Sequence, residues 1–324
     1  MAKKKSAVLR ELIEREAILL RPCVAIALQA KMAEAVGFEA LGISGSHTAS
    51  HILGLPDAGL ITMTEMVENI QRICNAVSIP VMADCDTGFG NAINVRRTVQ
   101  SVIQAGAAGL FIEDQVAPKR CGFVKGKELI SVEEAVGKYR AAVDARNELD
   151  PDFIIMARTD GRTAVGGSLE EAIRRAKAYQ EEAMVDVIYV EALQSKEEIK
   201  EVRAALDGPL ACSTQAIQPH PTLQELQALG MCLTLGIMFF EVGNVAMWDM
   251  LVAMKHRGLD PWIEWREKTK DHPMGGFGVF DLVGFPKVRE WEERYLPKEE
   301  YLAKYDKSLG LYEPQLGKNY DGAQ

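Results

Sequence analysis

The feature that most limits how this 324-residue chain can fold is a regular alternation between two kinds of segment. Short apolar runs rich in Val, Ile and Leu alternate with longer stretches whose apolar residues recur at helical spacing. This alternation predicts a parallel β-sheet that is covered by helices. Eight runs predict strands, which cover residues 23–28, 40–44, 80–84, 109–113, 153–158, 185–191, 209–213 and 231–236.

The stretches between these runs predict helices over residues 94–105, 132–147, 169–182, 196–206, 222–229 and 239–257. Ser131 and Ser168 precede two of them and are suitable helix caps. Eight strands that alternate with helices within about 250 residues predict a TIM (β/α)8 barrel. An open doubly wound sheet would also fit the alternation, but its usual GxGxxG turn does not follow the first strand here.

The two ends of the chain depart from the alternation. Residues 6–16 predict an N-terminal helix that could close the barrel floor or pack outside it. Beyond Arg257, residues 272–278 predict a loop and residues 287–295 a further helix. We therefore predict a catalytic barrel domain over residues 1–260. A C-terminal helical extension and tail over residues 261–324 is expected to pack on a neighbouring subunit.

Composition excludes several classes of protein. The formal net charge of −9 argues against nucleic acid as a partner. No apolar run is long enough for a membrane span and the start of the chain is not a secretion signal, so we expect a cytoplasmic protein without a membrane partner. The six cysteines form no CxxC pair, which argues against a zinc ribbon and against a secreted disulfide framework.

Carboxylates follow several of the predicted strands, at the barrel end where such folds place their chemistry. Asp84 and Asp86 follow the third strand, Glu113 ends the fourth, and Asp57 lies in the loop after the second. Acids that converge on one mouth repel each other unless a cation lies among them. Oxygen ligands without a His and Cys set favour Mg²⁺, or Mn²⁺, over zinc. The sequence therefore predicts a divalent metal site.

Two further segments carry groups suited to an anionic substrate. Arg158 lies on an apolar strand, where it is costly to bury unless it faces an acid or an anion. The loop over residues 115–127 is basic and flexible by composition, and such loops often close over substrates. Within it, Cys121 follows Arg120, and nearby cations are expected to stabilise its thiolate. Cys121 is therefore a candidate proton donor or acceptor.

Four other polar residues receive plainer interpretations. Asp114 and Asp160 are expected to act as helix caps or ion-pair partners. His47 and His51 are four residues apart, a spacing that can hold zinc on a helix, but the sequence offers no third ligand. A contact of one of these histidines with substrate or with the closing loop is the preferred interpretation.

Taken together, six short motifs resemble those of the isocitrate lyase and phosphoenolpyruvate mutase superfamily. They are Gly42-Ile43-Ser44-Gly45, Leu55-Pro56-Asp57, Asp84-Cys85-Asp86-Thr87-Gly88-Phe89-Gly90, Ile112-Glu113-Asp114-Gln115, Lys119-Arg120-Cys121-Gly122 and Ala157-Arg158-Thr159-Asp160. The resemblance covers residues 25–243 and is greatest to the branch of methylisocitrate lyase and 2,3-dimethylmalate lyase.

This resemblance implies a TIM barrel and a homotetramer whose neighbouring subunits exchange the C-terminal helix. It also implies which residues bind and react. Those implied to hold Mg²⁺, directly or through water, are Asp57, Asp84, Asp86 and Glu113; those implied to bind substrate are Ser44, Gly45, Ser46, Asp84, Gly122 and Arg158; those implied to take part in catalysis are Cys121, Arg158 and Glu191. Cys121 is the implied proton donor, in a gating loop.

The function implied is cleavage of a carbon–carbon bond in a 2-hydroxy dicarboxylate of the 2-alkylmalate or 2-methylisocitrate type. The products are pyruvate or another 2-oxo acid and a carboxylate, so the expected partner is a small 2-hydroxy or 2-oxo carboxylate. Oxaloacetate decarboxylation and phosphonopyruvate or phosphoenolpyruvate chemistry are alternatives, but they do not need the loop cysteine. A non-catalytic barrel that acts as a binding protein is the alternative of another class.

Three positions depart from the pattern of the lyases. Phe123 follows Lys-Arg-Cys-Gly where His is usual, and Gly42 stands where methylisocitrate lyase has Tyr. Around the seventh strand, residues 212–215 replace an expected Asn-bearing carboxylate site. All three changes are expected to remove polar contacts with the distal half of a tricarboxylate. A smaller or more apolar substrate, such as an alkylated malate, is therefore expected.

Overall fold

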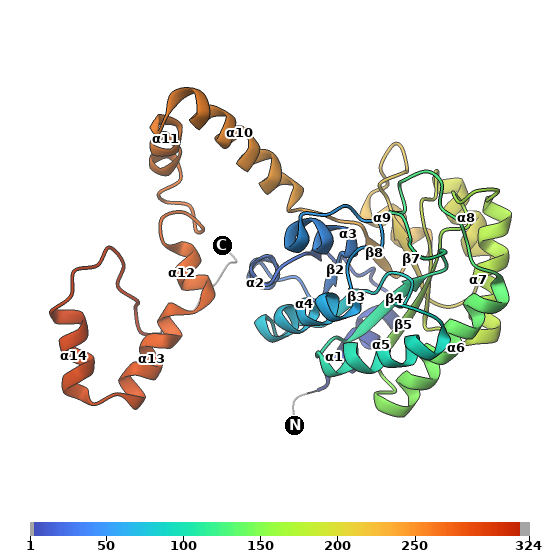
Figure 1. The fold of residues 1–324 in the computed structure, drawn as a ribbon, viewed down its shortest axis with the longest axis horizontal. Helices are drawn as coiled ribbons and strands as arrows, with labels where there is room; N and C mark the ends of the chain where they lie inside the picture. Colours follow the sequence, from blue (N-terminus) through green and yellow to red (C-terminus); the bar gives the residue numbers. More distant parts are fainter. Residues whose placement is uncertain (1–2, 318–324) are drawn as a thin grey trace. The chain divides into compact units, whose positions relative to one another are not determined.

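The computed structural model describes residues 3–317, of which the part up to residue 238 contains an α/β barrel (Figure 1). Its eight strands are parallel and follow sequence order. They are β1 (Cys23–Val24), β2 (Leu41–Ile43), β3 (Val81–Asp84), β4 (Gly109–Glu113), β5 (Ile154–Thr159), β6 (Val187–Val190), β7 (Leu210–Ser213) and β8 (Leu233–Leu235). The Leu19 N–H donates to the Cys232 carbonyl at 2.8 Å, which joins the β8 segment to the chain before β1. The predicted TIM barrel is confirmed.

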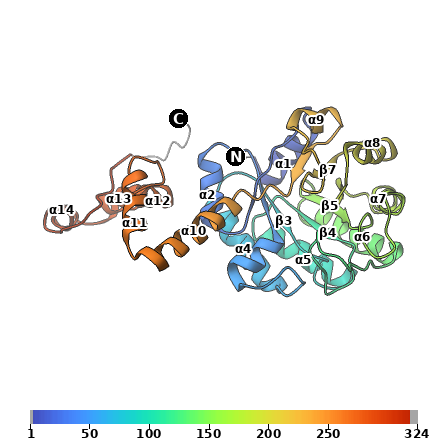
Figure 2. The same cartoon turned by 90° about the horizontal axis from the view of Figure 1, so that it is seen from above.

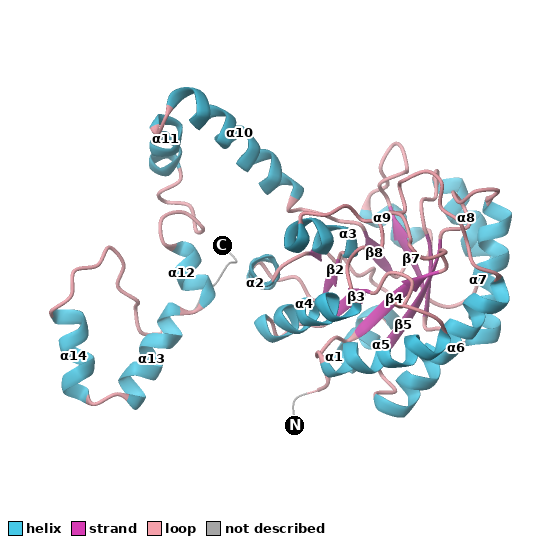
Figure 3. Cartoon of the chain, viewed as in Figure 1, coloured by secondary structure: helices cyan, strands magenta, loops and turns pink. Residues whose placement is uncertain are grey.

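Helices lie outside the strands (Figures 2 and 3). They are α2 (Ala27–Ala35), α3 (Gly45–Thr48), the π-helix η1 (Ala49–Leu53), α4 (Met63–Ala76), α5 (Ala92–Gln104), α6 (Val132–Leu149), α7 (Leu169–Ala183), α8 (Lys196–Ala205) and α9 (Leu223–Ala228). The predicted caps are present, since the Ser131 and Ser168 hydroxyls each accept a backbone N–H in the first helical turn. Helix α4 was not predicted, although Thr62 and Glu65 form a capping box at its start.

An apolar cluster fills the barrel interior below the polar end. Leu19, Met82 and Ile154 belong to it, and so do Leu9 and Ile13 from helix α1 (Lys5–Glu14). The N-terminal helix therefore closes the barrel floor, which was one of the two arrangements expected. Polar side chains are left to the opposite end, at the carboxyl ends of the strands.

Contacts divide the chain into two compact units, one that includes Phe38–Met238 and one that includes Lys31–Gly37 and the residues from 239 onward. The second unit contains α10 (Glu241–Arg257), α11 (Asp260–Lys268), α12 (Gly278–Val283), α13 (Phe285–Tyr295) and α14 (Lys298–Asp306). The domain boundary at residue 260 and packing on a neighbouring subunit stay predictions. Within residues 3–317, no helix is both long and apolar enough to cross a membrane.

Candidate active site

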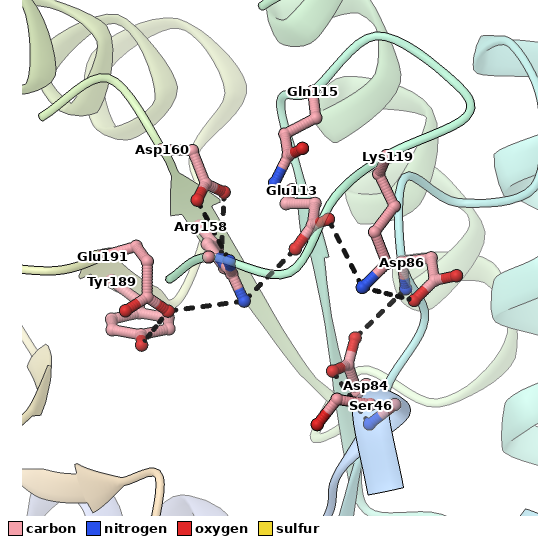
Figure 4. Close-up of polar contacts among 12 residues, drawn as sticks. Ser46, Asp84, Asp86, Glu113, Gln115, Lys119, Arg158, Asp160, Tyr189 and Glu191 are labelled. Atoms are coloured by element: carbon pink, nitrogen blue, oxygen red, sulfur yellow. Dashed lines mark hydrogen bonds and ion pairs between the residues drawn. The ribbon is translucent and has the colours of Figure 1, made fainter. Parts of the chain in front are cut away.

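The polar residues predicted at the strand ends lie together inside the barrel mouth (Figure 4). Asp84 ends β3 and Glu113 ends β4, while Arg158 lies near the end of β5 and Glu191 directly follows β6. The parallel register pairs Glu113 with Arg158 on adjacent strands. Their side chains are buried and form an ion pair, with 3.2 Å between Arg158 Nη1 and Glu113 Oε2.

The ammonium group of Lys119 lies among the predicted metal ligands. Its Nζ atom is 2.5 Å from Asp57 Oδ1, 3.2 Å from Asp86 Oδ1 and 3.8 Å from Glu113 Oε1. Lys119 is itself only 3% exposed. The loop after β4 thus places a positive charge where the sequence predicted a divalent ion. Lys119 was recognised as part of a basic loop but not as the partner of these acids.

Asp57, Asp84, Asp86 and Glu113, called the acid cluster below, strongly favour a positive charge beside them. Burial raises the pKa of Asp86 to about 6 against the opposing effect of Lys119, and burial also raises the pKa of Glu113 well above its usual value. Burial acts to lower the pKa of Lys119, but the surrounding carboxylates raise it well above the ordinary lysine value. Burial makes the ionised form of these carboxylates unfavourable, so they need a cation beside them to stay ionised.

The cluster also fits Mg²⁺ by the chemistry of its donors. Asp86 Oδ1 and both carboxylate oxygens of Glu113 are buried and accept no hydrogen bond from any described residue. Among residues 3–317, no three acid, His or Cys side chains form a ready-made metal cage. Mg²⁺ does not require one, because it keeps several waters and takes few direct carboxylate ligands. All-oxygen donors with spare lone pairs suit this mode of binding.

Arg158 is held by three carboxylates. Asp160 accepts two hydrogen bonds, from Nε and Nη2 at 3.0 Å each, and Nη1 lies 3.4 Å from Glu191 Oε2. Tyr189 donates its hydroxyl to Glu191, and its ring centroid lies 5.7 Å from the Arg158 guanidinium carbon. Although burial acts to lower the pKa of Arg158, these acids raise it well above the usual value, so the guanidinium stays charged. The contact from Tyr189 was not foreseen.

The other two acids of this region have structural partners, as predicted. Asp114 accepts the Thr159 hydroxyl at 2.8 Å and the Tyr179 hydroxyl at 2.6 Å. Asp160 lies 3.4 Å from the ammonium of Lys127 in addition to its bonds with Arg158. Asp160 therefore fixes the orientation of the guanidinium from behind.

The segment predicted to bind the oxyacid begins helix α3. Ser44 is the helix cap, and the Gly45 N–H donates to Asp84 Oδ2 at 3.0 Å. The Ser46 hydroxyl lies 3.2 Å from that of Ser44 and 2.9 Å from His47 Nδ1. His47 therefore contacts both hydroxyls, and its ring centroid lies 6.2 Å from that of His51. The segment and the acid cluster are joined through Asp84.

The loop that carries Cys121 is anchored at both ends. Gln115 pairs with Leu129 in an antiparallel bridge, and the Gln115 side chain bonds both the N–H and the carbonyl of Arg120. At the tip, the Cys121 N–H donates to the Asp57 carbonyl at 3.1 Å. The loop thus lies across the acid cluster and brings Cys121 to the same mouth.

The expected stabilisation of the Cys121 thiolate is wrong. Burial raises the pKa of the thiol, and this outweighs the attraction of Arg158 and Lys119. Flanking cations in the sequence suggested the opposite sign because they do not reveal how deeply the loop is buried. Cys121 is consequently a protonated thiol near neutral pH, which suits a proton donor better than an acceptor.

Gly122 passes so close to Arg158 that no side chain fits there. A Cβ atom at this position would lie 2.5 Å from Arg158 Nη2 and 2.8 Å from Glu191 Cγ. We expect Gly122→Ala to displace the loop or the guanidinium and to lower kcat/KM by about a hundredfold, the typical effect of a shift near 1 Å. Steady-state kinetics measure this. Gly137→Ala, at a position where an added Cβ meets no atom within 4 Å, is the control for the same substitution without a clash; equal losses in both variants would contradict the prediction.

Comparison with known proteins gives consistent results. Residues 9–253 match the family model described as phosphoenolpyruvate phosphomutase. The chain is 41% identical to 2,3-dimethylmalate lyase of Eubacterium barkeri over 90% of its own length and 98% of that protein. It is 38% identical to 2-methylisocitrate lyase of Aeropyrum pernix over 93% and 94%. A solved structure of phosphonopyruvate hydrolase in complex with oxalate and Mg²⁺ superposes with a TM-score of 0.80 at 29% identity, covering 91% of this chain and 100% of that one.

Proposed function

The chain belongs to the phosphoenolpyruvate mutase and isocitrate lyase superfamily and is a carbon–carbon bond lyase, and on this premise we propose that it cleaves a 2-alkylmalate with the help of Mg²⁺. The observation that carries this proposal is the buried acid cluster together with the loop that holds Cys121 against it through the bond from the Cys121 N–H to the Asp57 carbonyl. The expected products are pyruvate or a related 2-oxo acid and a simple carboxylate.

Asp57, Asp84, Asp86 and Glu113 would hold the metal, mostly through water. When bound, Mg²⁺ supplies Lewis acidity that lowers the pKa of the substrate hydroxyl and balances charge on the oxyacid. Support comes from the buried oxygens of Asp86 and Glu113, which are ion-paired but accept no hydrogen bond from a described residue, and from the related hydrolase with bound oxalate and Mg²⁺.

The chain's own residues would bind and protonate the substrate. Arg158 and the segment Ser44 to Ser46 would hold the oxyacid end. A carboxylate of the acid cluster accepts the hydroxyl proton. The electron pair of the broken carbon–carbon bond stays on the carbon next to the carboxylate of the departing product. The Cys121 thiol then protonates that carbon, and the proton held by the carboxylate of the acid cluster returns to the Cys121 thiolate. Glu191 keeps Arg158 and Tyr189 in place during these steps.

Release of pyruvate from a panel of 2-hydroxy and 2-oxo acids, which includes 2,3-dimethylmalate, 2-methylisocitrate and oxaloacetate, tests the proposal. We expect 2,3-dimethylmalate to be cleaved faster than 2-methylisocitrate, with activity lost in chelator and restored by Mg²⁺. Pyruvate detection by a coupled assay gives both rates. Faster cleavage of methylisocitrate would overturn the choice of substrate. Release of pyruvate from oxaloacetate, with no release from any 2-hydroxy acid, would favour the decarboxylase alternative. A binding protein would release nothing from any compound.

We further propose that the enzyme is a cytoplasmic homotetramer. The superfamily resemblance supports the tetramer, and helix α10 carries large exposed apolar residues, among them Val242, Trp248 and Leu251, that an assembly could cover. Light scattering of the full chain measures the subunit number.

A further inference from the structure

Arg21 is a buried cation without a partner. It is the largest of the fully buried side chains among residues 3–317, and all three guanidinium nitrogens lack a hydrogen bond to any described residue. Buried ions in proteins are normally paired, because the loss of hydration is costly and only a counter-charge compensates it. A guanidinium kept in this state points to a partner that comes from outside the chain.

The guanidinium lies directly below the candidate oxyacid segment. Arg21 follows Leu19 of the barrel-interior cluster by two residues, so its side chain also points inward. A Cβ atom on Gly42 would lie only 2.0 Å from Arg21 Nη1, so the guanidinium fills the space of a side chain at that position. Gly42 is on β2, two residues before Ser44 and on the same face. The absence of a side chain at Gly42 thus makes room for the Arg21 guanidinium.

Residues from separate strands of the barrel lie around Arg21. Burial acts to lower the pKa of the guanidinium, while nearby Cys23, Tyr189 and Asp84 act to raise it. Asp84 is on β3 and Tyr189 is on β6, three strands away around the barrel. Tyr189 in turn bonds Glu191, which pairs with Arg158.

We propose that Arg21 binds the second carboxylate of the dicarboxylate substrate, the one on the carbon that departs. The inference rests on the proposed function and extends it. A guanidinium offers two parallel N–H donors, which match the two oxygens of a carboxylate. The same carboxylate receives electron density when the carbon–carbon bond breaks, so a fixed cation beside it stabilises the transition state more than the ground state. Gly42 is what leaves room for this arrangement.

Binding measurements with matched ligands test the role of Arg21. Oxalate, with two directly joined carboxylates, can occupy only the oxyacid end; lactate presents one carboxylate and a 2-hydroxyl group, and malate differs from lactate by a second carboxylate on the next carbon. In the presence of Mg²⁺, calorimetry should show that Arg21→Met binds oxalate and lactate within about twofold of wild type. Arg21→Met should bind malate about ten to a hundred times more weakly than wild type does, because hydrogen bonds to a charged group are lost. The ligand-free variant should melt at or above the wild-type temperature, because an apolar side chain replaces an unpaired charge.

Gly42→Ala provides an independent variant that leaves Arg21 in the sequence. Its methyl group would occupy the place of Nη1, so the same selective loss of malate binding is expected. The double variant should bind malate no more weakly than either single variant, because both remove one interaction. Unchanged malate affinity in Arg21→Met, or equal losses for oxalate and malate with a lower melting temperature, would overturn the inference. If wild type binds no oxalate with Mg²⁺, the proposed function itself fails and the role of Arg21 fails with it.

Discussion

Cys121→Ser is expected to lower the turnover number by about a hundredfold or more, because a hydroxyl is a much weaker acid than the thiol that protonates the departing carbon. The serine side chain is similar in size, so the anchors of the loop at Gln115 and Asp57 are kept. Substrate affinity should change little. Pyruvate release at saturating substrate measures the effect, and rapid quenching shows whether bond cleavage or protonation has slowed.

A cysteine away from the mouth serves as the control for Cys121. Cys232 is partly buried and precedes β8 at the opposite end of the barrel from Asp84, so Cys232→Ser should retain nearly full turnover. Because burial raises the pKa of Cys121, wild-type turnover should not decline until the pH passes the ordinary thiol range of about 8.5. Near-wild-type turnover in Cys121→Ser would remove the cysteine from the mechanism and favour decarboxylation.

Arg158→Met is expected to lower the free energy of unfolding by about 3–5 kcal/mol, the usual cost of removing one partner from a buried ion pair. The substitution leaves Asp160, Glu113 and Glu191 buried without their shared cation. Urea denaturation measures the loss. The variant should also lose detectable lyase activity, since the oxyacid end of the substrate has no guanidinium to bind.

Arg162→Met is the matched control for this loss. Arg162 pairs with Glu198 at 2.7 Å but both side chains are partly exposed, so removal should cost at most about 1 kcal/mol. The deficit in Arg158→Met should grow with pH. Without Arg158, the buried acids should have a higher pKa in the folded variant than in its unfolded chain, so the folded variant binds extra protons at low pH. The stability gained from these protons is lost as pH rises above about 4.3 through the folded pKa, so the variant becomes less stable relative to wild type. A deficit that shrank between pH 5 and pH 8 would contradict this account.

Strand positions were predictable because buried parallel strands are continuous apolar runs. All eight strands of the barrel fall within or beside the predicted ranges, and the acids that end β3 and β4 were found from their place after those runs. Helix α4 was not predicted, although Thr62 and Glu65 form a capping box at its start. Local patterns therefore sufficed for the architecture and for the acid cluster.

Side-chain contacts between distant segments could not be predicted in the same way. Lys119 belongs to a basic loop, and nothing in its neighbours indicates that it lies beside Asp57 rather than in solvent. Arg21 precedes a strand whose inward residues are otherwise apolar, and its contact with Gly42 depends on how β1 and β2 are paired. The pKa of Cys121 had the wrong expected sign for a similar reason, since burial is a property of the folded loop.

Lys119 is a cation that balances the acid cluster in this structure, since its ammonium lies within 4 Å of Asp57, Asp86 and Glu113. The divalent ion proposed above would share these carboxylates with the lysine. Lys119 lies two residues before Cys121. The cation beside the acid cluster and the candidate proton donor therefore belong to one short piece of backbone, and a substitution that displaces Lys119 is expected to displace Cys121 as well.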